Sequence, residues 1–243
     1  MIKFAREIKY RLFSYLESLR YRGKDNRETF QKIYQNRLWG DSSQQFYSGP
    51  GSHDVKVVDP FVNSVLTFLK SLPNAPIVID LGCGDFNVGS KLLAACQLYI
   101  ACDVVPELIE HNKVKFANNS IDFRCVDIVK DELPKGEVVI IRQVLQHLSN
   151  ADIALVLPKL AAFKYVIITE HIPVGNFVPN LDKPSGLGIR MHNGLKKDSG
   201  VVITEPPFHF KAANVQTLQT TICEDQSQLV TWLFRFDVSE TKF

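Results

Sequence analysis

Two acidic residues flank a glycine turn in the stretch IVIDLGCGDFNVG, residues 77–89. Asp80 precedes Gly82-Cys83-Gly84 by one residue, and Asp85 follows it directly. Glycine has no Cβ, so a turn of this kind lets the backbone approach a ligand closely. A diphosphate in a partly buried site would be repelled by both carboxylates, at a cost on the order of a kcal/mol. The turn therefore favours a ligand that carries positive charge.

The dinucleotide fingerprint fits this turn poorly. Gly-x-Gly-x-x-Gly needs a third glycine, and that position is Asn87 here. S-adenosylmethionine (SAM) has no phosphate and carries an ammonium and a sulfonium group, which carboxylates attract. Asp103 ends the run LYIACD, 19 residues after Gly84, near the roughly 20-residue interval at which an acid accepts ribose hydroxyls. Asp127 ends FRCVDI, where a carboxylate can accept the adenine amino group. The acids and the turn together predict a SAM site.

Short apolar, β-branched runs alternate with segments that can form helices. Such alternation indicates a parallel sheet covered by helices on both faces. The expected strands are 77–81, 98–102, 121–126, 138–141 and 166–169, and the expected helices between them are 88–96, 104–116 and 151–162. After residue 180 the pattern changes, and 215–223 and 229–236 are typical of an antiparallel pair that closes the sheet.

The chain before the first strand is predicted to be helical with one long loop. Apolar residues at helical spacing predict an amphipathic helix over 2–21, and residues 1–30 hold eight Lys/Arg against four Asp/Glu. Residues 1–24 are thus a candidate for weak contact with an anionic membrane surface, the alternative being a helix packed on its own domain. A helix over 28–37 and a Gly/Ser-rich loop over 39–54 follow. Asp59 and Pro60 are expected to start the next helix, which runs to about residue 70.

Composition limits the class of protein. The 243 residues are 45% hydrophobic, enough for one large core. Lys and Arg number 28 against 26 Asp and Glu, so no overall charge recruits nucleic acid. The five cysteines are odd in number, and no two have the short spacing of a zinc or redox pair, which favours reduced thiols in the cytoplasm. No apolar run approaches the ~18–20 residues that span a bilayer.

The motifs resemble one family. DLGCGDFNVG, followed by CD, VDI and IIRQVLQHLS, is similar to the class I SAM-dependent methyltransferases, over roughly residue 33 to the C-terminus. The resemblance implies a Rossmann-like α/β fold, a seven-stranded sheet of order 3-2-1-4-5-7-6 with strand 7 antiparallel. Details such as SGPGS at 48–52 and EPPFHF at 205–210 resemble an uncharacterised bacterial group associated with polysaccharide and sugar-modification loci. The family's usual third glycine is Phe86 here.

The resemblance also implies an organisation and a set of cofactor contacts. Residues 1–53 would form a helical extension with a lid loop, and 54–243 the methyltransferase domain, with a substrate-side insert at about 172–210. SAM would be the cofactor and S-adenosylhomocysteine the product, with no metal. The predicted cofactor residues are Asp80, Gly82, Cys83, Gly84, Asp85, Asp103, Val104, Asp127, Ile128, Arg142 and Gln143. The predicted lid residues are Tyr34, Trp39, Ser48 and Gly49.

Catalysis would need alignment and, for a hydroxyl acceptor, removal of a proton. Methyl transfer from SAM is a direct displacement, so the protein positions the acceptor and supplies a base. His147, Glu170 and His171 follow the ends of two expected strands and are the candidates. Each has a structural alternative: His147 within VLQHL suits a buried packing histidine, and His171 a loop residue without a role. Arg142 could pair with Asp127 or Asp85.

The sequence indicates a class of methyl acceptor and does not identify the compound. We expect a hydroxyl of a small molecule or saccharide. An amine of a small molecule or protein side chain is the first alternative, and a SAM-fold binding module without turnover is the second. Methylation of base amino groups usually relies on an Asn/Asp-Pro-Pro-aromatic turn, and residues 142–145 read RQVL. Nucleic acid is therefore disfavoured as a substrate. The oligomeric state stays open.

Overall fold

The computed structural model describes residues 16, 25–40, 45–117, 121–192, 199–225 and 227–237. The predicted helix over 2–21 and the candidate membrane contact of residues 1–24 lie outside the described residues, apart from Leu16. Across the described ranges, no helix combines the length and apolar character needed to cross a membrane.

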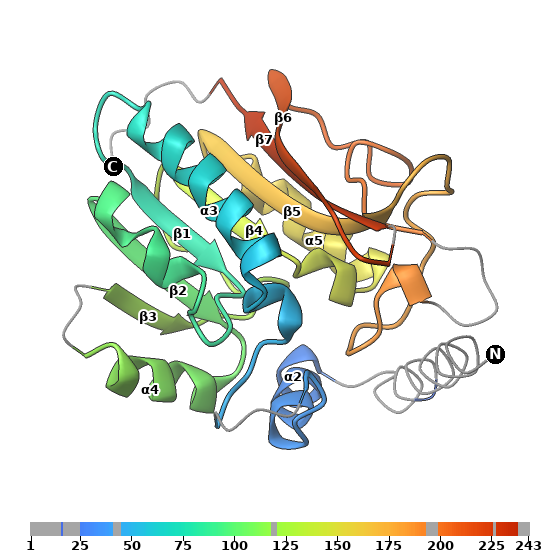
Figure 1. The fold of residues 1–243 in the computed structure, drawn as a ribbon, viewed down its shortest axis with the longest axis horizontal. Helices are drawn as coiled ribbons and strands as arrows, with labels where there is room; N and C mark the ends of the chain where they lie inside the picture. Colours follow the sequence, from blue (N-terminus) through green and yellow to red (C-terminus); the bar gives the residue numbers. More distant parts are fainter. Residues whose placement is uncertain are drawn as a thin grey trace.

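Seven strands form one sheet of order β3-β2-β1-β4-β5-β7-β6 (Figure 1). β1 to β5 pair in parallel, and β7 runs antiparallel to both β5 and β6. The fold expected from the sequence is confirmed, including the reversed strand. The strands are β1 (Ile77–Leu81), β2 (Leu98–Asp103), β3 (Ile121–Cys125), β4 (Val138–Arg142), β5 (Tyr165–Pro173), β6 (Asn214–Ile222) and β7 (Ser227–Arg235).

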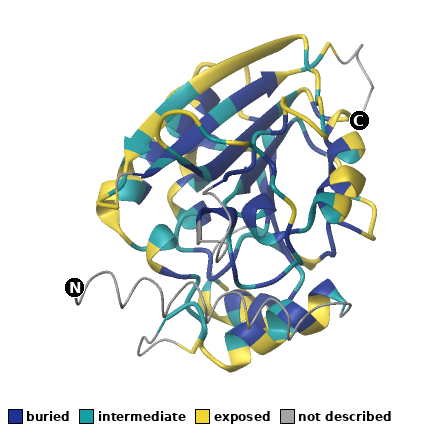
Figure 2. Cartoon of the chain, turned by 90° about the vertical axis from the view of Figure 1, so that its right-hand side faces the viewer, coloured by how far each residue is buried: buried dark blue, intermediate teal, exposed yellow. Residues whose placement is uncertain are grey.

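Apolar residues on the two faces of the sheet build two separate cores. Side chains alternate across a strand, so Val78 of β1 faces one core and Ile79 the other. α3 (Val55–Lys70) packs on the first core and α5 (Asn150–Leu160) on the second, in front of and behind the sheet in Figure 1. The central strands are buried on both faces (Figure 2). α4 (Pro106–Lys115) lies beside β2 and β3.

Two of the expected helices differ from the structure. Asp54, not Asp59, caps α3, because its side chain accepts from the backbone N–H of Lys56; Pro60 lies inside the helix. The segment 88–96 forms two 3₁₀ turns, η2 (Gly89–Lys91) and η3 (Leu93–Ala95), in place of one α-helix. Gly89 and Ser90 favour helix weakly, and the Cβ of any other residue at 89 would press on Phe86 and Asp80.

The chain that precedes the sheet returns to its carboxyl edge. α2 (Asn26–Gln35) starts at Asp25, whose side chain accepts from the backbone N–H of Arg27. Figure 1 shows α2 beyond the arrowheads of β1 and β2. The loop that follows includes the short turn η1 (Pro50–Ser52). Between β5 and β6 lies an irregular insert with the turn η5 (Arg190–His192). The extension, the insert and the sheet edge together surround one cavity.

Candidate cofactor and acceptor site

A cavity of about 290 Å³ lies at the carboxyl edge of the sheet. In open α/β sheets ligands bind at this edge, next to the point where the strand order reverses, here between β1 and β4. α2 and the loop that follows it form one wall, and the strand ends form another. The residues predicted from the sequence that line it are Tyr34, Trp39, Ser48, Gly49, Gly82, Cys83, Gly84, Asp103, Val104, Asp127, Ile128, Arg142, Gln143 and His147.

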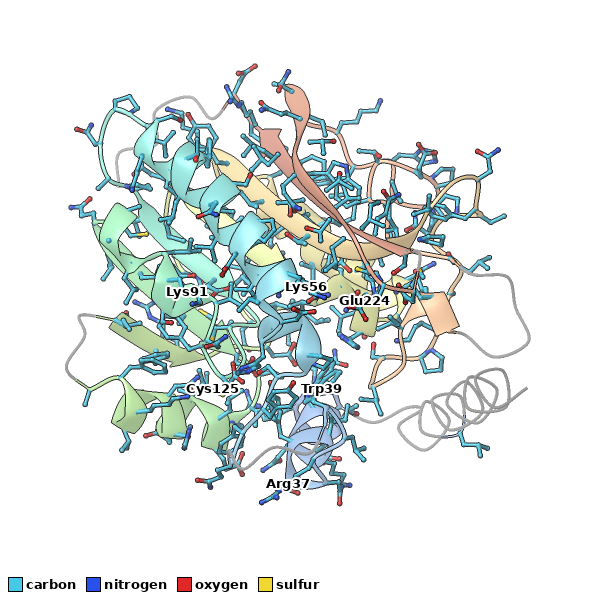
Figure 3. All side chains as sticks on the ribbon, in the orientation of Figure 1. Arg37, Trp39, Lys56, Lys91, Cys125 and Glu224 are labelled. Atoms are coloured by element: carbon cyan, nitrogen blue, oxygen red, sulfur yellow. The ribbon has the colours of Figure 1, made fainter. Side chains whose placement is uncertain are left out.

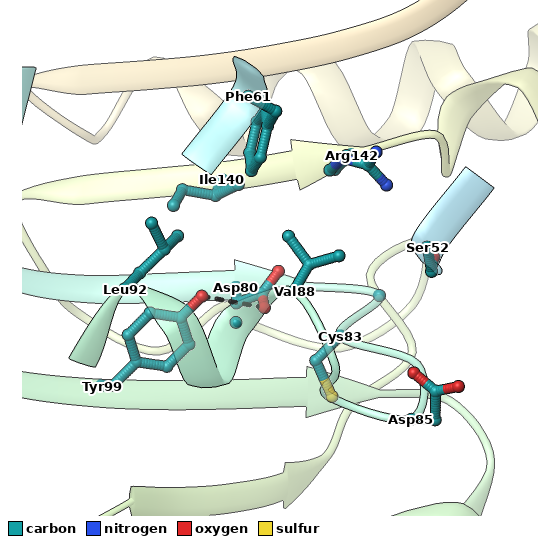
Figure 4. A pocket seen from close by; sticks show the side chains of 12 residues that line it. Ser52, Phe61, Asp80, Cys83, Asp85, Val88, Leu92, Tyr99, Ile140 and Arg142 are labelled. Atoms are coloured by element: carbon teal, nitrogen blue, oxygen red, sulfur yellow. Dashed lines mark hydrogen bonds between the residues drawn. The ribbon is translucent and has the colours of Figure 1, made fainter. Parts of the chain in front are cut away.

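Asp80 and Asp85 line a smaller chamber that shares Gly82, Cys83 and Arg142 with the cavity (Figure 4). Its volume is about 30 Å³, room for roughly one water molecule. Asp80 accepts a hydrogen bond of 3.0 Å from the Tyr99 hydroxyl, drawn dashed in Figure 4. Burial raises the pKa of Asp80 to about 7. The Asp80 carboxylate, which was predicted to contact the cofactor, therefore lines this smaller chamber and not the main cavity.

Asp85 ties the lid loop to the glycine turn. Its carboxylate accepts from the backbone N–H of Ser48 at 3.0 Å and contacts Nε2 of His53 at 2.6 Å. In return, its backbone N–H donates to Oγ of Ser48 at 2.7 Å. The lid and the turn thus hold each other by reciprocal hydrogen bonds. Asp85 was predicted to contact the cofactor, and His53 was not predicted at all, because a contact across 32 residues leaves no local pattern in the sequence.

The glycines are required by the close approach of the lid and of the β4 loop. Gly82 has φ 80° and Gly84 has φ 55°, the region that glycine adopts at little cost. A Cβ at Gly82 would collide with the Val144 side chain, and one at Gly84 with Ser48. Phe86, at the family's third glycine position, also has a positive φ of 62°. Its ring is fully buried among aromatic side chains beneath the turn, which explains why a large residue is held there.

Asp103 and Asp127 are held in place by backbone N–H groups. Asp103 accepts from Gly84 through Oδ2 and from Val105 through Oδ1, both at 3.1 Å. Burial raises the pKa of Asp103 to about 6, although these hydrogen bonds act in the opposite direction. Asp127 accepts from the backbone N–H of Val129 at 3.0 Å. Both carboxylates therefore have fixed positions before any ligand binds.

Arg142 lines both spaces, and no acidic side chain in the described part of the chain forms an ion pair with it. It donates to the Gly51 carbonyl at 2.8 Å and to Oε1 of Gln143 at 3.1 Å, instead of pairing with Asp127 or Asp85. Its guanidinium lies over the Phe61 ring, with 5.0 Å to the centroid. Burial lowers its pKa to about 10, and its Nε is buried without a hydrogen-bond partner among the described residues.

Aromatic residues form part of the cavity wall. The Trp39 ring meets the ring of His147 edge-on, with 4.7 Å between centroids, and the ring of Tyr34 at 6.3 Å. The Tyr34 hydroxyl is 2.9 Å from Oγ of Ser48, which links this wall to the lid loop. Trp39 Nε1 is buried with no partner in the described part of the chain. Leu187 and Ile189 of the insert complete the wall.

His147 is buried and held in one tautomer. Its Nδ1 lies 3.2 Å from the Leu187 carbonyl and 3.3 Å from that of Gly186. Both partners are acceptors, so Nδ1 carries the proton and Nε2 keeps its lone pair. The Gln146 amide approaches Nε2 at 3.3 Å. Burial, with the nearby charge of Lys183, lowers the pKa of His147 to about 3. The imidazole is therefore neutral at physiological pH.

Glu170 holds the turn η4 (Leu145–His147) and does not line the cavity. Its carboxylate is fully buried and accepts from the backbone N–H groups of Leu145 at 3.1 Å and Gln146 at 2.9 Å. Burial raises the pKa of Glu170 to about 8. The residue positions the turn that carries His147, which differs from the catalytic role predicted from its place after a strand.

Two buried cations of the insert hold the same turn from the other side. Arg190 donates to the carbonyls of Leu148 at 2.9 Å, Gln146 at 3.3 Å and Leu145 at 3.4 Å. Lys183 Nζ donates to the His147 carbonyl at 3.1 Å. We call Glu170, Lys183 and Arg190 the turn clamp. The sequence analysis missed both cations, because nothing local distinguishes a buried Lys or Arg from one in solvent.

His171 lies apart from the cavity. Its backbone N–H donates to Oε1 of Gln146 at 3.3 Å, and its side chain meets Oγ of Ser227 on β7. Side chains alternate along β5, so His171 points to the opposite face from Glu170. Of the three candidate bases, the structure brings only His147 to the cavity.

Comparisons with known proteins give the fold. No family model matches the sequence, and no curated protein matches it. Among solved structures, human N-acetylserotonin methyltransferase in complex with SAM has a TM-score of 0.59 at 20% identity, over 91% of this chain and 62% of that one. This chain thus spans less than two thirds of the human enzyme.

Two bacterial structures align over nearly their whole length. The N-methyltransferase NodS from Bradyrhizobium japonicum WM9, in complex with S-adenosylhomocysteine, has a TM-score of 0.60 at 13% identity, over 86% of this chain and 100% of that one. Magnesium protoporphyrin IX methyltransferase from Synechocystis PCC 6803 with bound SAM has a TM-score of 0.52 at 18% identity, over 88% and 99%. The chain therefore has the Rossmann-like fold of these methyltransferases.

Proposed function

We propose that the protein is a SAM-dependent methyltransferase that moves a methyl group to a hydroxyl of a small molecule or saccharide. The observation that carries the proposal is one cavity that joins two prepositioned carboxylates and a glycine turn to an aromatic wall with a neutral histidine. Neighbours of the same fold bind SAM or S-adenosylhomocysteine, as their descriptions state, and this supports the assignment.

The cofactor half of the cavity suits SAM. Asp103 would accept the ribose hydroxyls, and Asp127 the adenine amino group between the apolar side chains of Val104 and Ile128. Arg142 and the glycine turn would hold the methionine end. Buried Nε of Arg142 and Nε1 of Trp39 lack partners among the described residues, and a polar ligand would supply them. When bound, SAM supplies a methyl group on a sulfonium centre.

His147 would serve the acceptor. Transfer to a hydroxyl forms an O–C bond, breaks the C–S bond to leave a neutral thioether, and requires the hydroxyl proton to depart. Nε2 of His147 carries the lone pair that would take this proton in exchange for its 3.3 Å contact with the Gln146 amide, because Nδ1–H is held by two carbonyls. Trp39 offers an aromatic face to a sugar or other ring. The lid closes this wall against water.

A second candidate acceptor is an amine. One observation favours it: the pKa of His147 near 3 makes the imidazole a weak base, and a base works best when its pKa lies near the working pH. A free amine attacks without first losing a proton. We also propose a cytoplasmic location, which the odd number and wide spacing of the five cysteines favour. The sugar-locus resemblance supports a saccharide as the acceptor, and nucleic acid remains disfavoured.

The test is acceptor-dependent formation of S-adenosylhomocysteine. Purified protein and SAM are incubated with matched panels of hydroxyl compounds, saccharides and amines. We expect one class to be methylated, and His147→Gln to lower turnover by about 10²–10⁴ with SAM affinity unchanged. His209→Gln, an exposed histidine outside the cavity, is the control. Tight SAM binding without turnover on any panel would leave a binding module, and failure to bind SAM would refute the proposal.

A further inference from the structure

A second cluster of side chains lies outside the cavity, where three strands end. His171 is near the end of β5, Cys223 follows β6, and Asp225 lies in the turn to β7. One nitrogen, one sulfur and one oxygen from these residues all lie within 4.8 Å of one another. His171 and Cys223 are half-buried, and Asp225 is exposed. The cluster is therefore accessible from solvent on one side and backed by the sheet on the other.

Strand pairing and the β6–β7 turn bring these residues together. His171 is opposite Leu229 in the β5–β7 ladder, and Ile222 is opposite Gln228 in the β6–β7 ladder. The backbone N–H of Cys223 donates to the Ser227 carbonyl at 2.8 Å and closes the turn. Oγ of Ser227 contacts both Nε2 of His171 and Oδ1 of Asp225. Two potential ligands thus already converge on one point.

The chemistry of the cluster is that of a zinc site. Imidazole nitrogen, thiolate and carboxylate are the ligands that bind zinc, at about 2.0–2.3 Å. Tetrahedral geometry at those lengths puts ligand atoms about 3.3–3.7 Å apart, so small rotations of the side chains suffice. A thiolate with an imidazole disfavours magnesium and calcium, which take oxygen ligands.

Charge around the cluster also favours a cation. The carboxylates of Asp225 and Asp54 are close enough to act electrostatically on the half-buried Cys223 thiol. The Lys56 ammonium, at the start of α3, pairs with Glu224 at 3.0 Å, and both side chains, labelled in Figure 3, are mostly exposed. The carboxylates near the thiol would attract a divalent cation.

We propose that His171, Cys223 and Asp225 bind one divalent ion of the zinc class. The ion takes the place of the Ser227 hydroxyl as the link between the imidazole and the carboxylate, and water completes its coordination. The site is structural: it fastens the β6–β7 turn to the end of β5. Through the backbone of His171, which donates to Gln146, it steadies the strand end beside the η4 turn. It lies apart from the methyl-transfer cavity and supplies no step there.

Cobalt titration tests the site independently of SAM or any acceptor. Tag-free protein is stripped with a chelator, kept reduced and titrated with Co²⁺, while the near-ultraviolet absorption of a thiolate–cobalt bond is followed. We expect saturation at one equivalent and displacement by Zn²⁺. Cys223→Ser should abolish the band, and its affinity loss should exceed the roughly 10–100-fold that an outer-shell partner contributes. Asp225→Asn should retain the band with weaker affinity.

Cys125→Ser is the matched control, because Cys125 is the exposed cysteine remote from the cluster and should leave the titration unchanged. Thermal unfolding in excess chelator shows whether each variant is folded, and Zn²⁺ should raise the melting temperature of the parent but not that of Cys223→Ser. Absence of a thiolate band in the parent, or a band that survives in Cys223→Ser, would overturn the site. SAM binding measured in chelator reports on the methyltransferase proposal separately.

Discussion

The two halves of the cavity are built in different ways. The proposed cofactor half comes from residues 80–129 and from Arg142 at the end of β4, and its carboxylates are oriented by backbone N–H groups close in sequence or on the neighbouring strand. The acceptor half is assembled from α2 and the lid loop, the η4 turn and the insert. There the turn clamp, three buried ionisable side chains from two distant segments, holds the turn that carries His147.

This difference has an energetic consequence. Hydrogen bonds between a strand end and the following turn form with the sheet itself, so the cofactor half is stable once the sheet is. Buried charges are costly unless paired and hydrogen-bonded, so the acceptor half depends on every member of the clamp. We expect damage to the clamp to affect the acceptor half and the fold, and damage to Asp103 to affect cofactor affinity alone.

The largest effect is expected at the clamp. Arg190→Ala should lower the free energy of unfolding by about 3–5 kcal/mol, because it leaves the carbonyls of Leu145, Gln146, Leu148 and Leu181 without their donor and removes the positive charge that acts on buried Glu170. Urea unfolding measures the change. Arg190→Lys keeps the charge and should cost less, and Arg235→Ala, an exposed arginine, should stay within about 0.5 kcal/mol. Equal stability of Arg190→Ala and parent would mean that the clamp does not hold the turn.

A smaller effect is expected on the pH dependence of stability, through Asp80 in the small chamber next to the main cavity. Burial raises the pKa of Asp80 to about 7 from 3.8, so the folded state binds this proton more tightly than the unfolded state. The stability it contributes is complete below pH ~4 and is lost as pH rises through about 7. Asp80→Asn keeps an acceptor for the Tyr99 hydroxyl and removes the titration.

Relative to the parent, Asp80→Asn should therefore gain roughly 1–3 kcal/mol between pH 5 and pH 8. Urea unfolding of both proteins at the two pH values measures this difference. Glu170 titrates in both proteins and cancels in the comparison, whereas Asp103 acts on Asp80 through its charge and contributes to the difference. A difference that is constant with pH would show that the Asp80 carboxyl does not titrate in this range.

The smallest effect is expected on SAM affinity, at Ser48 of the lid loop, which contacts both the glycine turn and Tyr34. Ser48→Ala removes the acceptor for the backbone N–H of Asp85 and the contact with the Tyr34 hydroxyl. The loss should be about 1 kcal/mol, seen as a SAM dissociation constant raised about fivefold. Gln45→Ala, exposed in the same loop, is the control. If both variants bind SAM like the parent, the lid does not close over the cofactor.

The sheet and the position of the acids at its carboxyl edge were readable in the sequence because their signals are local. Asp103 was placed correctly at the end of β2, since an apolar run that stops at an acid marks a strand end directly. Glu170 and His171 were both assigned to catalysis because the strand was expected to stop at 169. β5 continues to Pro173, so the two side chains face opposite sides of the sheet.

Long-range contacts account for what the sequence did not reveal. The lid contact between His53 and Asp85 and the clamp contact between Lys183 and His147 join segments more than thirty residues apart. Both depend on the way the chain returns over the sheet edge, and residue type alone does not encode that path. Asp54 was overlooked as the cap of α3 because Asp59-Pro60 offers the stronger local signal.

Calorimetry of SAM binding to the parent and to Asp103→Ala tests the central claim most directly. We predict that the parent binds SAM, and that Asp103→Ala weakens binding tenfold or more, since a hydrogen bond to a charged carboxylate contributes about 1.5–3 kcal/mol. Affinity of the parent should also fall as pH drops through about 6, the pKa of Asp103. Unchanged affinity in Asp103→Ala, or tight binding of NADH in place of SAM by the parent, would contradict the account.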